Sequence, residues 1–153
     1  MATNRINEAK YEEVINPPLS FMAFLLFMYL SIAIAIWAAF DFLPAALTMF
    51  ALLLTVPLIW RKQQMRITVS DELRIDQAHI SLKYLIEPLA LDQNEYRALR
   101  SLQADARSFH ATRPWLKRGV RVKVNDERDP TTYWLIGCKR AEELVKALSQ
   151  AAK

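Results

Sequence analysis

Two long apolar runs dominate the first 60 residues and predict a pair of helices. The first run, residues 19–40, holds 22 consecutive uncharged residues, and the second ends at Trp60. A helix of 22 residues rises about 33 Å, enough to cross the roughly 30 Å hydrocarbon core of a bilayer. Asp41 carries the single charge between the start of the first run and the end of the second. The pattern predicts a transmembrane helical hairpin over residues 19–60, with helices at about 19–40 and 43–60.

The second run, residues 45–60, is the shorter of the two. Its sixteen residues rise only about 24 Å, so a buried core helix or a re-entrant segment is the alternative for this half. A long first helix that turns back through residues 41–44 needs a partner of matching depth, which favours the hairpin. A cleaved signal peptide fits less well, because the first run is longer than a usual signal core and another apolar run follows at once.

Positive charges near the helix ends predict the orientation. The turn at residues 41–44 has no Lys or Arg, whereas Arg5 and Lys10 precede the first helix and cations at residues 61–66 follow the second. Lys and Arg accumulate on the cytoplasmic side of membrane proteins. We therefore expect a multi-pass protein of the inner (plasma) membrane with both termini in the cytoplasm. The expected parts are a cytoplasmic N-terminal arm (1–18), the hairpin (19–60) and a cytoplasmic β-rich domain (61–153).

Alternating apolar and polar positions after the hairpin predict short antiparallel strands. The expected strands are residues 65–70, 73–75, 80–84 (with Pro88 ending that run), 107–111, 120–124 and 132–136. Asp92 followed by Glu95 predicts a capped helix over residues 92–102, and an apolar stripe predicts a C-terminal helix over 140–152. Short strands closed by such a helix resemble the pleckstrin-homology-like fold. The expected class is an α+β membrane protein: a transmembrane helical hairpin followed by a small antiparallel β-rich domain.

Four segments carry a closer resemblance to one family. They are Tyr11-Glu12-Glu13, residues 69–74 (VSDELR), residues 113–115 (RPW) and residues 129–135 (DPTTYWL). In this order, around a pair of helices entered through prolines, they are similar to the actinobacterial two-helix membrane proteins grouped as domain of unknown function 3093. The resemblance covers nearly the whole chain. It implies a bacterial inner-membrane protein with no assigned activity and no catalytic or ligand residues to transfer.

Composition limits the chemistry of the chain. Two glycines and one cysteine argue against a glycine-rich phosphate loop, a disulfide framework and a multi-cysteine metal site. Cys138 with His110 is a conceivable nucleophile and base, or else a buried cysteine and a polar strand residue. Cys138 also departs from the small hydroxylated residues that the family resemblance implies there, which makes it a poor candidate for an essential thiol.

The remaining polar candidates are few. Asp126, Glu127 and Asp129 suit part of a cation site, an acid/base pair or a solvated hairpin tip. Neither apolar run contains Asp, Glu, Lys, Arg or His, which argues against a pump or carrier. Small residues such as Ala35 leave pairing with another membrane protein open. We expect no catalytic residue, no cofactor and no metal site.

Cations concentrate in one short segment. From residue 61 onward the chain has 18 Lys or Arg and 12 Asp or Glu, a net charge of +6, whereas residues 1–60 have a net charge of −2. Residues 113–123 hold five cations and no acid. The candidate contact residues in this segment are Arg113, Trp115, Lys117, Arg118, Arg121 and Lys123.

A membrane tether suggests what this basic segment meets. Each Lys or Arg near an anionic leaflet contributes about 1 kcal/mol of binding, and a Trp-Leu tip suits the headgroup region. We expect a non-enzymatic, membrane-anchored module that binds lipid headgroups or a protein partner at the cytoplasmic leaflet. The alternatives are a merely solvated basic face, an accessory subunit of a larger membrane complex, or an enzyme on a lipid-borne substrate. The tether and the lack of a binding motif argue against nucleic acid.

Overall fold

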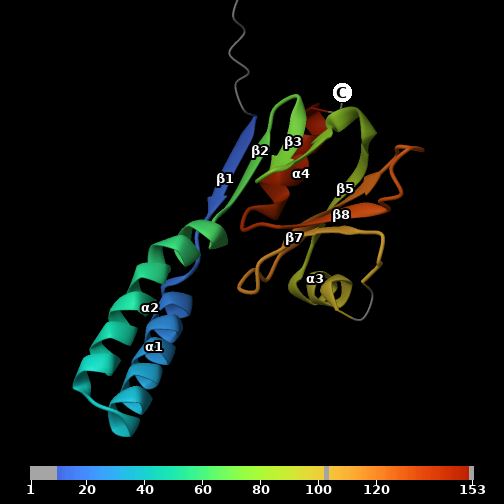
Figure 1. Cartoon of the computed structure of the whole chain (residues 1–153). Helices are drawn as coiled ribbons and strands as arrows, with labels where there is room; N and C mark the ends of the chain where they lie inside the picture. Colours follow the sequence, from blue (N-terminus) through green and yellow to red (C-terminus); the bar gives the residue numbers. More distant parts are fainter. Residues whose placement is uncertain (1–9, 102–103, 152–153) are drawn as a thin grey trace, which may run out of the picture. The chain divides into compact units, whose positions relative to one another are not determined.

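The computed structural model describes residues 10–101 and 104–151, and these fall into two compact units. One unit, residues 16–64, is the helical hairpin (Figure 1). The other, which we call the β-rich domain, is built from the chain on both sides of that hairpin. The hairpin is therefore an insertion within the sequence of the β-rich domain.

The hairpin consists of α1 (Leu19–Ala39) and α2 (Phe42–Gln63), which lie side by side in opposite directions (Figure 1). Both helices are long and apolar enough to cross a membrane. At 22 residues α2 rises about 33 Å, because it begins at Phe42, before the second apolar run, and continues through Arg61 and Lys62 to Gln63. Its uncharged part, residues 42–60, rises about 28 Å, close to the thickness of a hydrocarbon core.

Polar side chains within the two helices bond to the helices themselves. The hydroxyl of Ser31 donates to the carbonyl of Phe27, and that of Thr48 donates to the carbonyl of Pro44, both at 2.9 Å. Tyr29 of α1 and Thr55 of α2 share a hydrogen bond of 2.6 Å between their hydroxyl oxygens. Internal bonding of this kind is what polar groups need in a hydrocarbon environment.

The first sheet of the β-rich domain is an antiparallel meander in the order β1-β2-β3-β4. Its strands are β1 (Tyr11–Ile15), β2 (Met65–Val69), β3 (Glu72–Ile75) and β4 (Ala78–Ser81). The sequence analysis expected only an arm where β1 lies. Because a charged residue, Glu13, occupies an inward position of β1, the strand lacks the apolar alternation that marks the others.

The second sheet has the order β5-β7-β8-β6. A 3-10 turn, η1 (Leu82–Tyr84), leads into it where the sequence had predicted more strand. Its strands and the helix inserted among them are β5 (Leu85–Leu91), α3 (Gln93–Arg100), β6 (Phe109–Ala111), β7 (Gly119–Val124) and β8 (Tyr133–Gly137). The predicted capping box of α3 is confirmed, with both Asp92 and Glu95 in place. The all-antiparallel expectation is corrected, since β6 pairs with β8 in parallel.

The prediction that Pro88 ends a strand run is wrong. β5 continues through Pro88 by means of a bulge between Ile86 and Leu89, where Glu87 has a positive φ of 50°. Proline has no N–H to donate to a ladder, and a bulge supplies a position where none is needed. Lys123 of β7 forms an ion pair with Glu87 and so holds the bulge.

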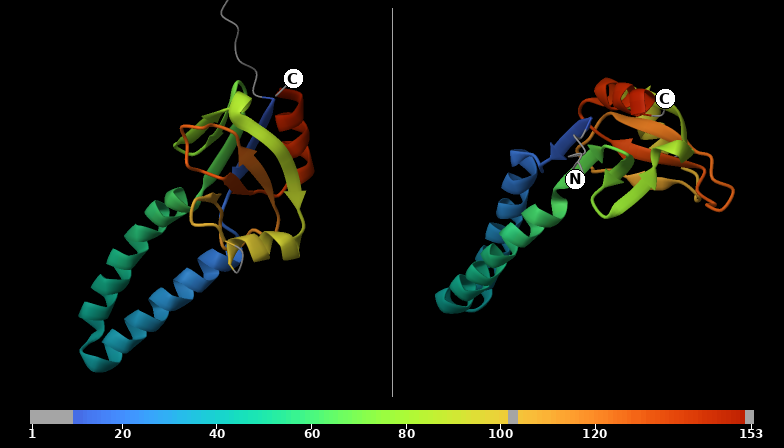
Figure 2. Two further views of the ribbon diagram at one scale, coloured as in Figure 1. Left: turned by 90° about the vertical axis from the view of Figure 1, so that its right-hand side faces the viewer. Right: turned by 90° about the horizontal axis from the view of Figure 1, so that it is seen from above.

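The C-terminal helix, α4 (Ala141–Ala151), closes the domain by packing against β5, β7 and β1. Leu144 and Leu148 on its apolar stripe are buried. Since β1 belongs to the first sheet and the other two strands to the second, α4 joins both sheets to one core. Figure 2 shows this helix in red beside the strands of the second sheet.

Candidate functional site

The structure places the six candidate contact residues of the basic segment, residues 113–123, in different surroundings. Arg113 pairs at 3.4 Å with Asp76, in the turn between β3 and β4, and the side chain of Arg113 is only 21% exposed. Lys123 pairs with Glu87, and the pKa of that carboxyl is lowered mainly by the hydrogen bond from Lys123. The neighbouring Arg121 lowers the same pKa further. A segment free of acids in the sequence therefore has acids beside it in space.

Four of the six residues, Arg113 among them, lie in the loop between β6 and β7, residues 112–118, which we call the basic loop. Lys117 and Arg118 are exposed there, and no ion pair between either of them and the rest of the described chain is present. Trp115 is half-buried and packs against the core. Its indole ring is thus a support for the loop, whereas the two cations after it are free to meet a ligand.

The basic loop faces the helix α3 across a pocket of about 200 Å³. Its walls are Gln93, Tyr96, Arg97 and Arg100 from the helix, and Pro114, Trp115, Leu116 and Lys117 from the loop. Within the described ranges the lining contains three cations and no carboxylate. We call this hollow the α3 pocket.

Sequence reasoning missed the two arginines of the α3 pocket. Arg97 and Arg100 are three residues apart on a helix whose boundaries the capping box had already indicated. Side chains at this spacing lie on the same face of a helix. The spacing was a usable signal, but only the tertiary fold shows that this face meets Lys117.

Packing under α3 holds the Arg100 side chain in place. Its guanidinium lies 5.4 Å from the centre of the Tyr96 ring and 3.5 Å from the carbonyl oxygen of Leu116, to which it donates. Burial raises the pKa of Tyr96 to about 12, so its hydroxyl is neutral at pH 7. The ring itself packs against Gly119, where an added Cβ would lie 2.6 Å from Cε2 of Tyr96. The hydroxyl of Tyr96 lies against Gly137.

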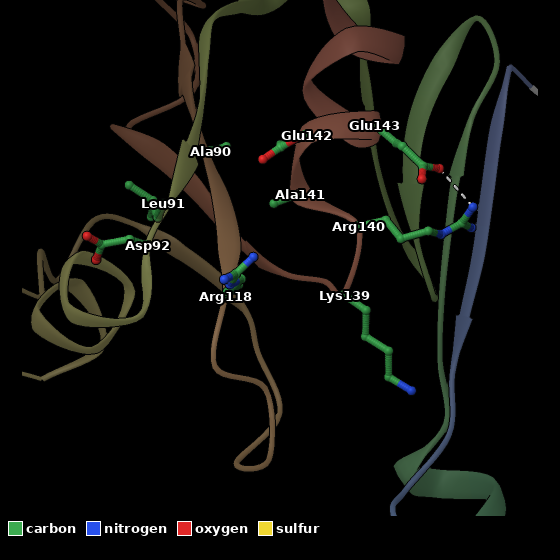
Figure 3. A pocket seen from close by; sticks show the side chains of 9 residues that line it. All are labelled: Ala90, Leu91, Asp92, Arg118, Lys139, Arg140, Ala141, Glu142 and Glu143. Carbon is green, nitrogen blue, oxygen red and sulfur yellow. Dashed lines mark hydrogen bonds and ion pairs between the residues drawn. The ribbon is translucent and has the colours of Figure 1, made fainter.

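A second, larger pocket of about 560 Å³ opens at the start of α4 (Figure 3). Cations and carboxylates line it in equal number: Asp92, Arg118, Lys139, Arg140, Glu142 and Glu143. Arg140 is paired with Glu143 at 2.9 Å, as the dashed line in Figure 3 shows, and Asp92 caps α3. The balance of charge gives this pocket no preference for one sign of ligand.

The candidate nucleophile Cys138 is buried beside Glu13. Desolvation, reinforced by the Glu13 carboxylate, raises the pKa of the Cys138 thiol to about 12. A thiol with such a pKa is protonated at pH 7 and is a poor nucleophile. The side chain of His110 contacts Ser108 instead, with 2.6 Å between Nε2 and Oγ.

This Ser108–His110 pair was not foreseen from the sequence. The Ser108 hydroxyl already donates its hydrogen to the carbonyl of Asp105 at 2.6 Å. The hydrogen of the bond between Ser108 and His110 must then come from the imidazole. Because a base has to accept the proton of its nucleophile, this arrangement does not activate the serine.

The acidic residues after β7 form a turn. Asp126 accepts from the backbone N–H of Arg128 at 3.0 Å, and Asp129 accepts from that of Thr131 at 2.9 Å. These are the bonds by which aspartates stabilise turns. Over residues 10–101 and 104–151, no group of three or more His, Cys, Asp or Glu side chains is arranged to hold a metal ion.

Comparison with known proteins gives one result. The family described as "Protein of unknown function (DUF3093)" matches residues 10–148. No curated protein and no solved structure matches the chain.

Proposed function

The chain belongs to the DUF3093 family of proteins of unknown function, and we propose that it is a non-enzymatic, membrane-anchored module that contacts anionic lipid headgroups at the cytoplasmic leaflet. The family resemblance inferred from the motifs is thereby confirmed, while its description names no activity. The proposal is therefore drawn from the chemistry of the chain alone.

Two features support a membrane anchor. The helices α1 and α2 are both long and apolar enough to span a bilayer. Their surfaces expose large aromatic side chains, among them Phe24, Phe27 and Phe50, each more than 60% exposed. Exposed apolar surface on this scale is costly in water and favourable in lipid. The membrane in this proposal is the inner membrane of an actinobacterium, with both chain ends in the cytoplasm.

The observation that carries the proposal is the pair of exposed cations in the basic loop, Lys117 and Arg118, neither of which forms an ion pair with another described residue. One residue, Gln64, separates the end of α2 from the first residue of β2, so the β-rich domain stays close to any membrane that holds α2. Cytoplasmic leaflets carry anionic lipids, and their attraction falls off within about 8 Å at physiological salt. The short connection to α2 and the exposed cations of the basic loop together support contact with such a leaflet.

The proposal includes a pleckstrin-homology-like fold for the β-rich domain. Two four-stranded sheets followed by a C-terminal helix that contacts both support this likeness. The parallel pair of β6 with β8 and the inserted helix α3 depart from a simple antiparallel pattern. An experimental structure whose strands and final helix failed to superpose on that fold would remove this part of the proposal.

Deuterium exchange on the full chain in lipid nanodiscs tests the contact. We expect the amides of the basic loop to exchange more slowly in discs containing phosphatidylglycerol than in pure phosphatidylcholine discs. Raising the salt concentration should remove the difference, because screening weakens contacts between exposed charges. Equal exchange in the two lipids would contradict the proposal.

Charge reversal sharpens this experiment. The double variant Lys117→Glu/Arg118→Glu should lose the protection by anionic lipid, and its fold should be preserved because both side chains are in solvent. A matched control, Arg128→Glu/Lys146→Glu, changes the net charge equally at two other exposed positions and should keep the protection. Loss in both variants would indicate a general effect of net charge.

One observation favours the second candidate, an accessory subunit of a membrane complex. β5 is an edge strand of its sheet and exposes Ile86 and Leu89, at 39% and 46%. Apolar side chains on an open edge are typical of surfaces that pair with another protein. Co-purification at fixed stoichiometry in mild detergent, lost in Ile86→Ser/Leu89→Ser, would favour this candidate.

A further inference from the structure

We propose that the α3 pocket is a binding site for a single phosphate group with a double negative charge, presented either as a phosphomonoester lipid headgroup or as free phosphate. The inference deepens the proposed function and rests on it for the lipid source of the phosphate. It assigns a defined stoichiometric site in place of a diffuse attraction.

Charge selects the class of ligand. The pocket is lined by Arg97, Arg100 and Lys117, and no acid of the described chain lies among its walls. None of these three side chains is engaged in an ion pair with another described residue. A phosphomonoester carries a charge of about −1.5 to −2 at pH 7. It therefore neutralises more of the positive charge of these three side chains than a singly charged phosphodiester does.

The donor geometry suits phosphate oxygens. A guanidinium presents its N–H groups in a planar fork that matches phosphate, and the ammonium of Lys117 adds a mobile third contact. Arg100 is held by the Tyr96 ring and the Leu116 carbonyl, so little side-chain freedom is lost when it binds. The amide of Gln93 adds a neutral polar group at the same rim.

Size limits the ligand. The α3 pocket has a volume of about 200 Å³, below the roughly 300–1,000 Å³ of pockets that enclose drug-sized molecules. It accommodates a phosphate group and leaves the rest of a larger molecule outside. A lipid whose phosphate entered the pocket would therefore keep its acyl chains in the bilayer.

Calorimetry on the full chain in an uncharged detergent tests the site. The probes are inorganic phosphate, dioctanoyl phosphatidic acid (a monoester), dioctanoyl phosphatidylglycerol (a diester) and dioctanoyl phosphatidylcholine. We expect saturable binding of one phosphatidic acid per chain, weaker binding of phosphatidylglycerol, and no binding of phosphatidylcholine. Failure of the unmodified chain to bind either phosphate or phosphatidic acid would overturn the proposal.

Two variants locate the binding. Arg97→Gln/Lys117→Gln alters two exposed walls and should weaken binding by about tenfold or more, since hydrogen bonds to charged groups are among the strongest in proteins. Arg128→Gln/Lys146→Gln removes the same charge elsewhere and should bind as the unmodified chain does. An equal loss in both variants, or no loss in the first, would contradict a site in the α3 pocket.

A third variant separates charge from geometry. Arg100→Lys keeps the positive charge and removes the guanidinium fork, so binding should fall while the salt dependence changes little. Thermal unfolding of each variant checks that the fold is intact. If Arg100→Lys does not fold, the double variant with exposed side chains still decides the question.

The probes also distinguish the source of the phosphate. Equal affinity for inorganic phosphate and phosphatidic acid would indicate a site for free phosphate, whereas much tighter binding of the lipid would indicate a headgroup. Because detergent provides no leaflet, these results do not depend on the nanodisc experiment. Phosphate binding without protection by anionic discs would support the site and contradict the proposed leaflet contact.

Discussion

At the scale of single residues, the chain uses both of its glycines to seat one aromatic ring. A Cβ at Gly119 would lie 2.6 Å from Cε2 of Tyr96, and one at Gly137 would meet the Tyr96 hydroxyl oxygen and lie 2.7 Å from Cδ1 of Leu116. Both distances are far below van der Waals contact. The neighbouring strands β7 and β8 thereby leave space for Tyr96, which in turn supports Arg100 in the α3 pocket.

The packing of Tyr96 against the two glycines predicts opposite effects on stability for two substitutions. Gly119→Ala should destabilise the domain by about 1–3 kcal/mol or more, because overpacking forces neighbours to shift. Tyr96→Phe should be neutral or slightly stabilising, since within the described part of the chain the buried hydroxyl of Tyr96 has no hydrogen-bond partner. Denaturant unfolding measures both changes. A large loss of stability in Tyr96→Phe would show that the hydroxyl does have a partner.

Adjacent glutamates on β1 offer a matched pair of substitutions. Glu13 is 6% exposed and accepts hydrogen bonds from the Tyr11 hydroxyl at 2.6 Å and the Lys139 backbone N–H at 3.1 Å. Glu13→Ala should cost about 1–3 kcal/mol because it leaves buried donors without an acceptor. Glu12 is exposed and makes a surface pair with Arg66, so Glu12→Ala should cost no more than about 1 kcal/mol. Equal losses in chemical denaturation would contradict this account of β1.

At the scale of elements, the hairpin separates two strands that pair with each other. Ile15, the last residue of β1, lies opposite Met65, the first residue of β2. The hairpin therefore occupies the place of a turn between neighbouring strands. This arrangement also means that a fragment starting at residue 61, the domain boundary expected from sequence, lacks β1.

Replacing the hairpin by a turn tests this connection. Joining Ile15 to Met65 through Asn-Gly should give a soluble, cooperatively folded domain, because that dipeptide forms the tight turn of two-residue hairpins. A fragment of residues 65–153 should be molten or aggregated, since β2 would lose its partner and Arg140 would lose its contacts with Tyr11 and Glu12. Circular dichroism and thermal unfolding compare the two. A fragment as stable as the joined chain would contradict the contribution of β1.

The loop before β6 predicts a dependence on pH. Asp105 accepts from the Thr132 hydroxyl at 2.6 Å and from the Arg107 backbone N–H at 2.9 Å, and these bonds, the Thr132 bond first, hold its pKa below the usual range. Its stabilising contribution is fully present above the unfolded pKa of about 4 and is lost as the pH falls through the lower folded value. Carboxyl NMR titration of the joined domain should give a depressed pKa, which Thr132→Val should raise. An unchanged pKa in that variant would contradict the assignment.

At the scale of the whole molecule, sequence reasoning succeeded where local patterns are strong. Both long helices, the capped helix α3 and the alternating strand β7 follow directly from apolar periodicity and capping residues. It failed where one residue contradicts the pattern around it. Glu13 interrupts the apolar alternation by which β1 would have been recognised. Pro88 is compatible with β5 only because of a bulge that the local sequence does not predict.

The candidate site was predictable only in part. The basic loop stands out in the sequence as three cations within six residues, on both sides of Trp115, and Lys117 does line the α3 pocket. The acids that neutralise Arg113 and Lys123, and the arginines that complete the pocket, lie on other elements of the fold. Long-range pairing of charges is a property of tertiary structure. The cluster of cations in residues 113–123 therefore predicted a larger basic surface than the fold has there, and it did not predict the α3 pocket.

The proposed topology, a membrane hairpin with the β-rich domain on the cytoplasmic side, is tested most directly by cysteine accessibility. In a Cys138→Ser chain, which removes the one native cysteine, Asp41→Cys marks the turn between the helices and Ser149→Cys marks the exposed face of α4. An impermeant maleimide should label the first variant in intact cells whose outer barriers have been removed, and the second only after the membrane is opened. Labelling of Ser149→Cys in intact cells, or of both variants only after opening, would contradict the account.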